Sequence, residues 1–346
     1  MPGLCETPER LASSELHGHC VSAERHPGQP ARNSATAPPE FNCRHRFMFA
    51  LSRIHCSTSQ RASALAGRLA GAFALFGTSP AAAQVSSEQV FVTPDWAREH
   101  AEVWVDARDD VSYALSHHPD AVHLPWTDFT TRSQSGLLLS TDQLQGRLGT
   151  AGISRDLTVV VYGEWDRGWG EEGHFFWLLE YLGHDDVHIL EGGWAAWISS
   201  GGPSTTAVEV PLATEFVADV QPGLLADRDQ VLRMSTELET GLILDVRTDE
   251  EFQGGRLHGE VRGGRIPGAE HTDWRTLLGS PHPAGPVGAM EVGLDAPIVT
   301  YCTGGVRSGF AYAALRAAGY TRVSNYAGSF WEWSADPDLP LASEHK

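Results

Sequence analysis

The chain has 346 residues, a length that accommodates about two domains of ordinary size. Apolar residues make up 41% of the chain and charged residues 20%, which is the composition of a globular protein and argues against bulk disorder. The formal net charge is −19, so broad attraction to nucleic acid or to anionic lipid is not expected. Because no run of 18 uncharged apolar residues occurs, the sequence predicts no transmembrane helix.

The first 84 residues differ in composition from the rest of the chain. They contain eight Arg, five Glu and four of the five cysteines, but no Trp and no Tyr. Residues 85–346 carry a net charge of −22 and a single cysteine, Cys302. A chain that enters an oxidising compartment with one cysteine has no internal disulfide, so Cys302 is a candidate reactive thiol.

Residues 48–84 have the order of an export signal. Three arginines, with no acidic residue in the segment, precede a short apolar core at Leu69–Phe76, and the small residues Ala81–Ala83 offer a cleavage site before Gln84. We expect residues 1–84 to be a leader, made of an upstream extension and this signal, and the mature protein to be exported to the periplasm. A mitochondrial-type transit peptide is the alternative, because Arg and Ser are abundant and acids are absent.

The part that follows the leader contains two weakly similar halves. Val103–Arg108 resembles Leu242–Arg247, and Val159–Tyr162 resembles Ile298–Tyr301, both with an offset of 139 residues. Short apolar runs typical of buried parallel strands alternate with stretches of helical spacing. The predicted strands are Val103–Val105, Val159–Tyr162, Val187–Leu190, Ile298–Tyr301 and Arg322–Tyr326, and the predicted helices are Phe175–Leu182 and Gly309–Ala318.

This alternation predicts an α/β fold with a parallel sheet in each half. A stretch rich in Ser, Gly, Thr and Pro separates the halves. We therefore place the first domain at residues 85–203, a linker at 204–222 and the second domain at 223–346.

One loop of the second half carries residues suited to chemistry. The loop follows the predicted strand Ile298–Tyr301 and consists of Cys302, Thr303, Gly304, Gly305, Val306, Arg307 and Ser308. The two glycines allow successive backbone N–H groups to point inward, and a helix begins directly afterwards. These dipoles favour an anion and lower the pKa of the thiol, and the thiolate is the nucleophilic form. A buried structural cysteine is the alternative, but packing does not explain the adjacent glycines.

The chain resembles the tandem-domain rhodanese family of sulfurtransferases over about residues 86–341. The resemblance is carried by Asp245-x-Arg247, Glu251-Phe252-x-Gly254, Ile266-Pro-Gly-Ala269, the Cys302 loop and Tyr326–Trp333. It implies two rhodanese-like domains, each a parallel sheet flanked by helices. It also implies an active cysteine in the second domain, a catalytically silent first domain, and neither a metal nor a cofactor. Gly163 stands where Cys302 would be in the first half, and its loop is three residues longer, which fits a domain without a nucleophile.

The resemblance implies ping-pong transfer of a sulfane sulfur. The Cys302 thiolate would take sulfur from a small donor, thiosulfate or 3-mercaptopyruvate, and pass it to a thiophilic acceptor such as cyanide or a thiol. The loop amides would hold the terminal sulfur of the persulfide, and Asp245 and Arg247 would support the loop. Arg307 would either neutralise an anionic donor or brace the loop by pairing with an acid such as Asp245. Bracing is favoured, because the amides already form the cradle.

The residues around Cys302 match no single donor preference. Thr303 and the two glycines after it are neutral, as in mercaptopyruvate-using relatives, but Arg307 departs from that pattern. Glu251 stands where some thiosulfate-using relatives carry a substrate-binding arginine, so its charge is expected to repel a dianion. Thiosulfate ranks first by a narrow margin, because rhodaneses often accept several donors and export suits a stable inorganic one. Trp331 and Trp333 are expected either to wall the cleft or to pack in the core.

Other classes of function compete with an enzyme of this kind. A non-enzymatic sulfur carrier or persulfide relay would use the same Cys302. Cysteine phosphatases and arsenate reductases typically have five residues between Cys and Arg, whereas four separate Cys302 from Arg307. Gly168–Gly173 fits a dinucleotide-binding pattern, but Glu171 and Glu172 would face a pyrophosphate.

The remaining histidines give no metal pattern. His117, His118, His184 and His188 lie in predicted loops or near strand ends without a matching set of carboxylates. We expect them to be solvated surface side chains. The sequence identifies no protein partner.

Overall fold

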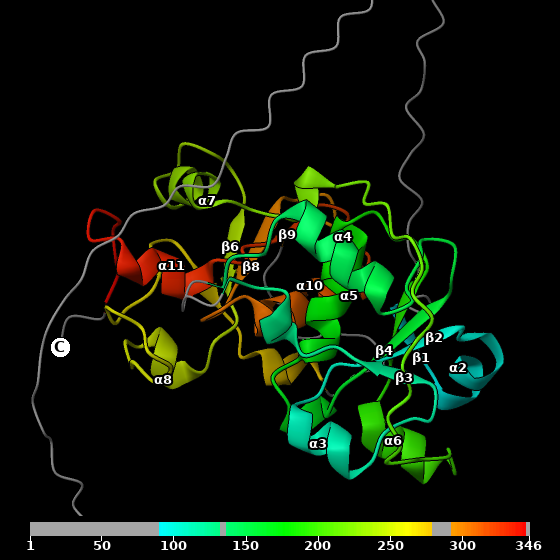
Figure 1. Cartoon of the computed structure of the whole chain (residues 1–346). Helices are drawn as coiled ribbons and strands as arrows, with labels where there is room; N and C mark the ends of the chain where they lie inside the picture. The colour runs from blue at the N-terminus through cyan, green and yellow to red at the C-terminus, as the bar shows by residue number, and fades with distance from the viewer. Residues whose placement is uncertain (1–89, 132–135, 279–291, 344–346) are drawn as a thin grey trace, which may run out of the picture. The chain divides into compact units, whose positions relative to one another are not determined.

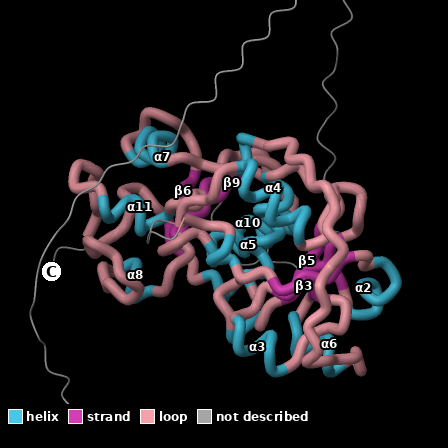
Figure 2. The backbone as a smooth tube through the Cα atoms, viewed as in Figure 1, coloured by secondary structure: helices cyan, strands magenta, loops and turns pink. Residues whose placement is uncertain are grey.

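The computed structural model describes residues 90–131, 136–278 and 292–343, all of which lie within the unit Phe76–Lys346. The predicted leader, residues 1–84, lies outside the described residues. The described chain forms two α/β halves, each built around its own sheet (Figures 1 and 2). No helix in the described ranges is long and apolar enough to cross a membrane.

The helices and strands follow the predicted alternation. The first half contains β1 (Phe91–Val92), α2 (Pro94–His100), β2 (Val103–Asp106), α3 (Asp110–Leu115), β3 (Ala121–His123), η1 (Trp126–Asp128), α4 (Thr141–Thr150), β4 (Val159–Tyr162), η2 (Trp165–Arg167), α5 (Glu171–Tyr181), β5 (Val187–Leu190) and α6 (Gly193–Ser199). The second half contains η3 (Pro222–Leu224), α7 (Arg228–Ser235), β6 (Leu242–Asp245), α8 (Asp249–Phe252), β7 (Glu270–His271), η4 (Trp274–Leu277), β8 (Ile298–Tyr301), α10 (Val306–Ala317), β9 (Val323–Asn325) and α11 (Ser329–Ala335).

The two sheets have corresponding strand orders, β1-β5-β4-β2-β3 and β7-β6-β8-β9. Every pairing within them is parallel, and the central strands are buried along their whole length, as expected for a sheet covered on both faces. Asp106 lies opposite Tyr162 in the first sheet, and Asp245 lies opposite Tyr301 in the second. The predicted α/β fold and the 139-residue repeat are therefore confirmed.

The helices α5 and α10 begin earlier than predicted. Their N-caps are Gly170 and Gly305, which adopt left-handed φ values of 77° and 88° that favour glycine. Neither cap provides a side chain, so the usual signal of a helix start is missing from the sequence. As a result, Arg307 and Ser308 belong to the first turn of α10 rather than to the loop before it. The edge strands β3 and β7 were not predicted, because runs of two or three residues have no usable periodicity.

The halves meet where α5 crosses α10, as Figure 1 shows. A Cβ on Gly173 would collide with Phe310, and a Cβ on Gly309 would lie 2.6 Å from the Cα of His174. The two helix backbones are therefore in direct contact, which only glycine at both positions permits. A single hydrophobic core continues through this crossing from one half to the other.

The segment predicted as a linker lies against the first half. It contains no helix or strand between α6 and η3. The Thr214 amide donates to the Gly149 carbonyl at 2.9 Å, the Asp219 amide donates to the Leu182 carbonyl at 2.9 Å, and Phe216 is buried. The predicted domain boundaries remain a prediction.

The prediction of solvated surface histidines is wrong, because His117, His118, His184 and His188 are all buried. His117 stacks on Tyr113, and its ring nitrogens lie 2.7 and 3.0 Å from backbone carbonyl oxygens. His118 stacks on Trp104, and burial lowers its pKa to about 4. Aromatic stacking and local backbone partners thus make these imidazoles part of the core. Among the described residues, no group of three or more metal-ligating side chains occurs.

Gly163 follows β4 in the first half as Cys302 follows β8 in the second half. In the first half, a buried carboxyl occupies the space beside this position. Any Cβ on Gly163 would collide with Oε2 of Glu172, which is fully buried in the first turn of α5. Neither carboxyl oxygen of Glu172 has a hydrogen-bond partner among the described residues. Burial, with a smaller effect of the Glu171 carboxylate, raises the pKa of Glu172 to about 8. The space around Gly163 is therefore filled by a carboxyl that is neutral near pH 7.

We predict that Glu172→Gln reduces the loss of stability between about pH 5 and pH 8. The folded-state pKa of about 8 lies above the unfolded value of about 4.3, so this group's contribution to stability is complete below about pH 4.3 and is lost as pH rises through about 8. Between pH 5 and pH 8 the variant should gain about 2–5 kcal/mol relative to the natural chain in the free energy of unfolding.

Denaturant unfolding at several pH values measures this difference. Glu191→Gln, at an exposed position, is the matched control and should leave the pH dependence as it is. Parallel pH profiles for the natural chain and Glu172→Gln would contradict the assignment of a neutral, buried carboxyl.

Candidate active site

Cys302 lies between the end of β8 and the start of α10, as predicted. Its side chain is buried, and the Gly305 N–H donates to Sγ at 3.1 Å. The Ser308 hydroxyl lies 3.6 Å from the same sulfur. The thiol therefore sits at the N-terminus of a twelve-residue helix, within a turn whose polar hydrogens point at the sulfur.

The backbone of Cys302 is fixed by the start of α11. The Cys302 amide donates to Ser329 Oγ at 3.2 Å, and the Ser329 hydroxyl donates to the Tyr326 carbonyl at 2.7 Å. The amides of Phe330 and Trp331 donate to the carbonyls of Cys302 and Thr303 at 3.0 and 2.8 Å. Ser329 adopts a left-handed φ of 49°, a conformation uncommon for a residue with a Cβ. The Tyr326–Trp333 motif thus holds the backbone of the cysteine loop in place through these hydrogen bonds.

The electrostatic surroundings favour the thiolate of Cys302. Burial by itself would raise the pKa of this thiol. The Arg307 guanidinium, the amide and hydroxyl of Ser308 and the Gly304 amide act in the opposite direction, and the net pKa is lowered. A buried thiol with a lowered pKa next to a cation has the properties of a nucleophile.

Arg307 forms a buried, two-pronged ion pair with Glu251. Its Nη1 and Nη2 donate to the two carboxylate oxygens at 2.7 and 2.8 Å, and Nη2 also donates to Thr303 Oγ1 at 2.7 Å. Arg307 therefore braces the loop, the role favoured from the sequence. The suggested partner, Asp245, is wrong, because Asp245 pairs with Arg247.

Glu251 has a local structural role as well. It is the third residue of α8 and forms a capping box with Thr248, whose amide donates to Glu251 Oε2 at 3.0 Å. Although burial opposes ionisation, the bonds from Arg307, Thr303 and Thr248 hold the pKa of Glu251 well below its ordinary value. The expectation that Glu251 repels a dianion is therefore corrected: its charge is compensated by Arg307 and does not face the donor alone.

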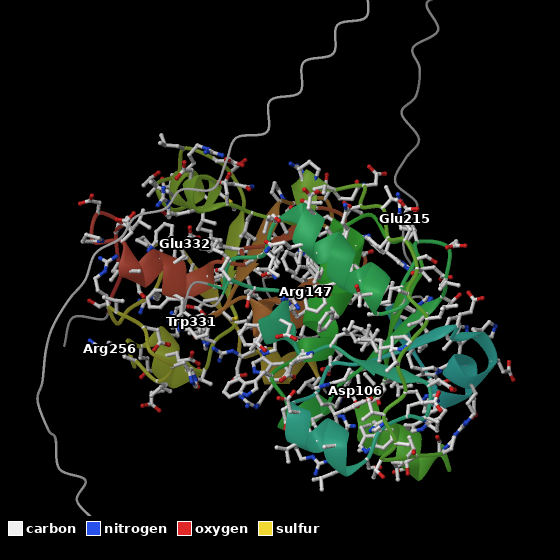
Figure 3. The ribbon with its side chains drawn as sticks, viewed as in Figure 1. Asp106, Arg147, Glu215, Arg256, Trp331 and Glu332 are labelled. Atoms are coloured by element: carbon white, nitrogen blue, oxygen red, sulfur yellow. The ribbon has the colours of Figure 1, made fainter. Side chains whose placement is uncertain are left out.

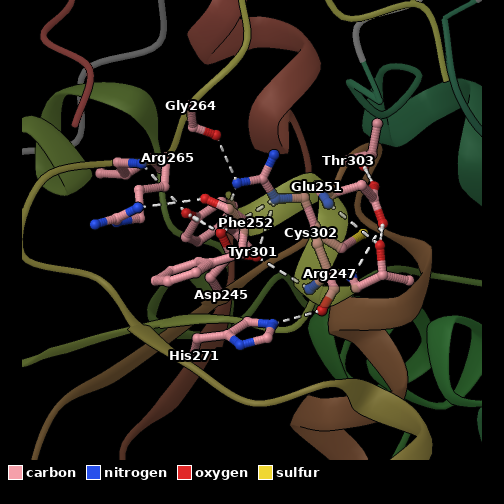
Figure 4. Close-up of polar contacts among 12 residues, drawn as sticks. Asp245, Arg247, Glu251, Phe252, Gly264, Arg265, His271, Tyr301, Cys302 and Thr303 are labelled. Atoms are coloured by element: carbon pink, nitrogen blue, oxygen red, sulfur yellow. Dashed lines mark hydrogen bonds and ion pairs between the residues drawn. The ribbon is translucent and has the colours of Figure 1, made fainter. Parts of the chain in front are cut away.

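Asp245 and Arg247 form a second buried ion pair behind the loop (Figure 4). The Arg247 Nη2 donates to Asp245 at 2.7 Å and to the Gly264 carbonyl at 2.9 Å. The Tyr301 hydroxyl, directly before the cysteine, donates to the same Asp245 carboxylate. This pair ties the ends of β6 and β8 together and supports Cys302 without contacting it, which matches its predicted supporting role.

Aromatic side chains from both halves border the loop and the Arg307 guanidinium. The Trp331 ring, labelled in Figure 3, packs on Gly304, and its Nε1 donates to the His258 carbonyl at 2.9 Å. The ring centroid of Trp169, from the first half, lies 5.5 Å from Cζ of Arg307 and 5.2 Å from the ring centroid of His258. The Trp169 side chain is 44% exposed. Trp331 thus walls the site, whereas Trp333 is buried in the core.

Several residues of the site were missed by the sequence analysis. They are Trp169, His174, His258, Glu260, Asn325 and, as a hydrogen-bonding group, Ser329. Ser329 lies inside a motif that had been recognised. Trp169 and His174 come from the first half, Asn325 from the end of β9, and His258 and Glu260 from the segment between α8 and β7, so only their approach in three dimensions reveals them.

Comparison with known proteins supports the division into two similar halves. The Rhodanese-like domain matches twice, at residues 93–200 and 227–336. A sulfur carrier protein, TtuD, of Thermus thermophilus is 30% identical over 288 residues, covering 73% of this chain and 96% of that protein. A thiosulfate sulfurtransferase of Azotobacter vinelandii is 31% identical over 248 residues, covering 69% of this chain and 90% of that protein.

The fold has counterparts among solved structures. The wild-type structure of EanB superposes with a TM-score of 0.68 at 20% identity, covering 76% of this chain and 71% of that one. This likeness concerns the fold alone. With the domain matched in both halves and relatives that align over nearly their full length, the chain belongs to the rhodanese family of sulfurtransferases, in its two-domain form.

Proposed function

We propose that this sulfurtransferase moves a sulfane sulfur from thiosulfate to a thiophilic acceptor, cyanide or a thiol, through a persulfide on Cys302. The observation that carries the proposal is the position of the Cys302 sulfur, which accepts the Gly305 N–H and lies beside the Ser308 hydroxyl at the start of α10. The Gly305 N–H and the neighbouring amides of Gly304 and Ser308 can hold an anionic sulfur before and after the transfer.

In the first step the Cys302 thiolate attacks the outer sulfur of thiosulfate. A bond forms between Sγ and that sulfur while the sulfur–sulfur bond of thiosulfate breaks, and sulfite leaves with the electron pair. The negative charge that remains on the terminal sulfur of the persulfide is stabilised by the loop amides and the helix N-terminus. In the second step cyanide attacks this sulfur, thiocyanate leaves, and the thiolate is restored.

The two ion pairs near the loop bear on which sulfur donor the protein uses. Glu251 is neutralised by Arg307 and Asp245 by Arg247, so neither carboxylate adds a free negative charge near Cys302. The main sequence-based objection to a dianionic donor is therefore removed. Curated relatives in Azotobacter vinelandii and Pseudomonas aeruginosa carry the name thiosulfate sulfurtransferase, which supports the same donor here.

A sulfur-carrier function is the second candidate, favoured by the similarity to the Thermus carrier protein. It would form the same persulfide but turn over only with a protein acceptor, so steady-state assays with thiosulfate and cyanide distinguish the two. Phosphatase chemistry is disfavoured, because Arg307 donates to Glu251 and Thr303, whereas a phosphatase arginine is directed at the bound anion.

We predict that Cys302→Ser keeps the fold and loses sulfur transfer. Serine is nearly isosteric, but no described residue places a base in contact with this side chain to activate a hydroxyl. After incubation with thiosulfate, intact-mass analysis should show one added sulfur on the natural chain, removed by cyanide, and none on the variant. Ser235→Ala is the control: this residue lies at the end of α7, away from the loop, so the variant should retain both the adduct and turnover. Sulfur transfer by Cys302→Ser would disprove the mechanism.

We predict that Glu251→Gln lowers both the stability of the chain and the pKa of Cys302. Arg307 would remain buried without a counter-charge, which costs about 3 kcal/mol. Its positive charge would then act on the thiolate without compensation. Denaturant unfolding and the pH dependence of Cys302 alkylation measure the two effects. Glu250→Gln, on the exposed side of the same helix, makes the same charge change and should alter neither. Unchanged values for Glu251→Gln would contradict the role given to the ion pair.

We also propose that the chain is exported, on the strength of the arginines, apolar core and small residues in residues 48–84. Cleavage after Ala83 would leave a mature protein that starts at Gln84. Intact-mass measurement of the protein purified from its native host should give this shorter chain. A mass that includes residues 48–84 would rule out the proposal.

A further inference from the structure

The first half has Gly163 at the position that corresponds to Cys302, but it contacts the cysteine loop. His174, in the second turn of α5, is fully buried, and its Nδ1 lies 3.3 Å from the Gly305 carbonyl oxygen. Gly136, also in the first half, packs against the backbone of Gly304 and Ala327. The loop that surrounds Cys302 is thus bordered by the other half at two of its glycines.

The contact of His174 defines the state of its ring. A carbonyl oxygen only accepts hydrogen bonds, so Nδ1 must carry the proton. Burial lowers the pKa of His174 to about 4, so the ring is neutral at physiological pH. Its Nε2 has no hydrogen-bond partner among the described residues. The bond to Gly305 is therefore the polar contact that orients this imidazole.

The Gly305 carbonyl also accepts bonds from within the second half, where the Gly309 N–H donates to it at 3.3 Å inside α10. Asn325, at the end of β9, donates its Nδ2 to this oxygen at 3.1 Å. The Asn325 Oδ1 accepts from the Ser308 hydroxyl at 2.7 Å, and that hydroxyl lies 3.6 Å from Cys302 Sγ. Two donors from the second half and one from the first therefore hold the same carbonyl, within a network that reaches the sulfur.

Holding this carbonyl also sets the direction of the amides in the cradle. Gly305 donates its own N–H to Cys302 Sγ and has a left-handed backbone. Because the next peptide is planar and trans, an oxygen directed toward His174 and Asn325 places the Val306 N–H on the other side. Rotation of this peptide would redirect the dipoles that favour the thiolate.

Packing alone does not require histidine at this position. The helix crossing is nearly symmetric, because Gly173 of α5 faces Phe310 and Gly309 of α10 faces His174. Phe310 therefore takes the place in α10 that His174 takes in α5. A purely apolar ring fills one side of the crossing, so the polar atom on the other side needs a different explanation.

We propose that His174 is a positioning residue for the active site, which holds the Gly305 carbonyl so that the loop amides face the Cys302 sulfur. Its effect on turnover rests on the proposed function of Cys302, whereas its effect on ionisation of the thiol does not. The nucleophile-free half would then contribute directly to the reactivity of the cysteine.

The test compares variants with and without a donor at the position of Nδ1. His174→Leu and His174→Phe remove the donor and keep an apolar side chain, whereas His174→Asn can place its amide nitrogen near the position of Nδ1. The rate of alkylation by iodoacetamide is followed against pH on the full chain, with modification quantified on the Cys302 peptide by mass spectrometry. Thiosulfate–cyanide turnover is measured in parallel.

We expect the alkylation midpoint of the Leu and Phe variants to rise by about half to one pH unit, with a loss of up to about tenfold in kcat/KM near neutral pH. His174→Asn should return both values toward those of the natural chain. Tyr312→Phe is the matched control: it removes a hydrogen bond between α10 and Glu180 of α5 at the same crossing but away from the loop, so its midpoint should not move.

Two results would overturn the proposal. The Leu and Phe variants could keep the natural midpoint, or His174→Asn could shift it as far as His174→Leu does. Failure of the proposed function looks different: Cys302→Ser would still transfer sulfur, while the alkylation midpoints of the His174 variants would continue to report on the thiol.

Discussion

The ion pair between Arg307 and Glu251 is the interaction on which the active site depends. A thiolate at a buried position needs positive charge nearby, but an isolated buried guanidinium would itself be costly. Glu251 resolves this by accepting both prongs of Arg307 at 2.7 and 2.8 Å while it caps α8. The capping box places Glu251, Glu251 places Arg307, and Arg307 together with the start of α10 stabilises the sulfur anion. A local feature of a four-residue helix is thus connected directly to the chemistry.

The two halves have the same arrangement of strand, ion pair and helix start, but the group enclosed by this arrangement differs between them. In both, a buried parallel strand ends next to an acid–arginine pair, Asp106–Arg108 or Asp245–Arg247, and a helix begins after a left-handed glycine. In the second half the enclosed space holds a sulfur surrounded by donors. In the first half it holds the carboxyl of Glu172, which receives no hydrogen bond from the part of the chain that the structure describes and is neutral near pH 7. The packing of Glu172 therefore leaves no room for a cysteine side chain at Gly163, the position in the first half that corresponds to Cys302.

Much of this could be predicted from the sequence, and the rest could not for physical reasons. Strands β4, β5 and β8 were predicted with their observed bounds, because fully buried parallel strands are short apolar runs. The glycine-capped starts of α5 and α10 were not, because a left-handed N-cap leaves no side-chain signal. The partner of Arg307 was misassigned, because several acids are available in sequence and only the register of α8 against α10 selects among them. The buried histidines were misjudged because stacking partners such as Trp104 and Tyr113 are recognisable only in three dimensions.

The contact between the halves explains why a half without a nucleophile is part of the active site. Gly173 and Gly309 allow the backbones of α5 and α10 to touch, and this closeness brings His174 to the Gly305 carbonyl and Trp169 to the Arg307 guanidinium. The core runs through the crossing without interruption, so separating the halves would expose apolar surface and also remove one wall of the cysteine loop. The repeat therefore acts as one unit: the second half supplies the reacting atom, and the first half supplies part of the rigid frame that keeps that atom reactive.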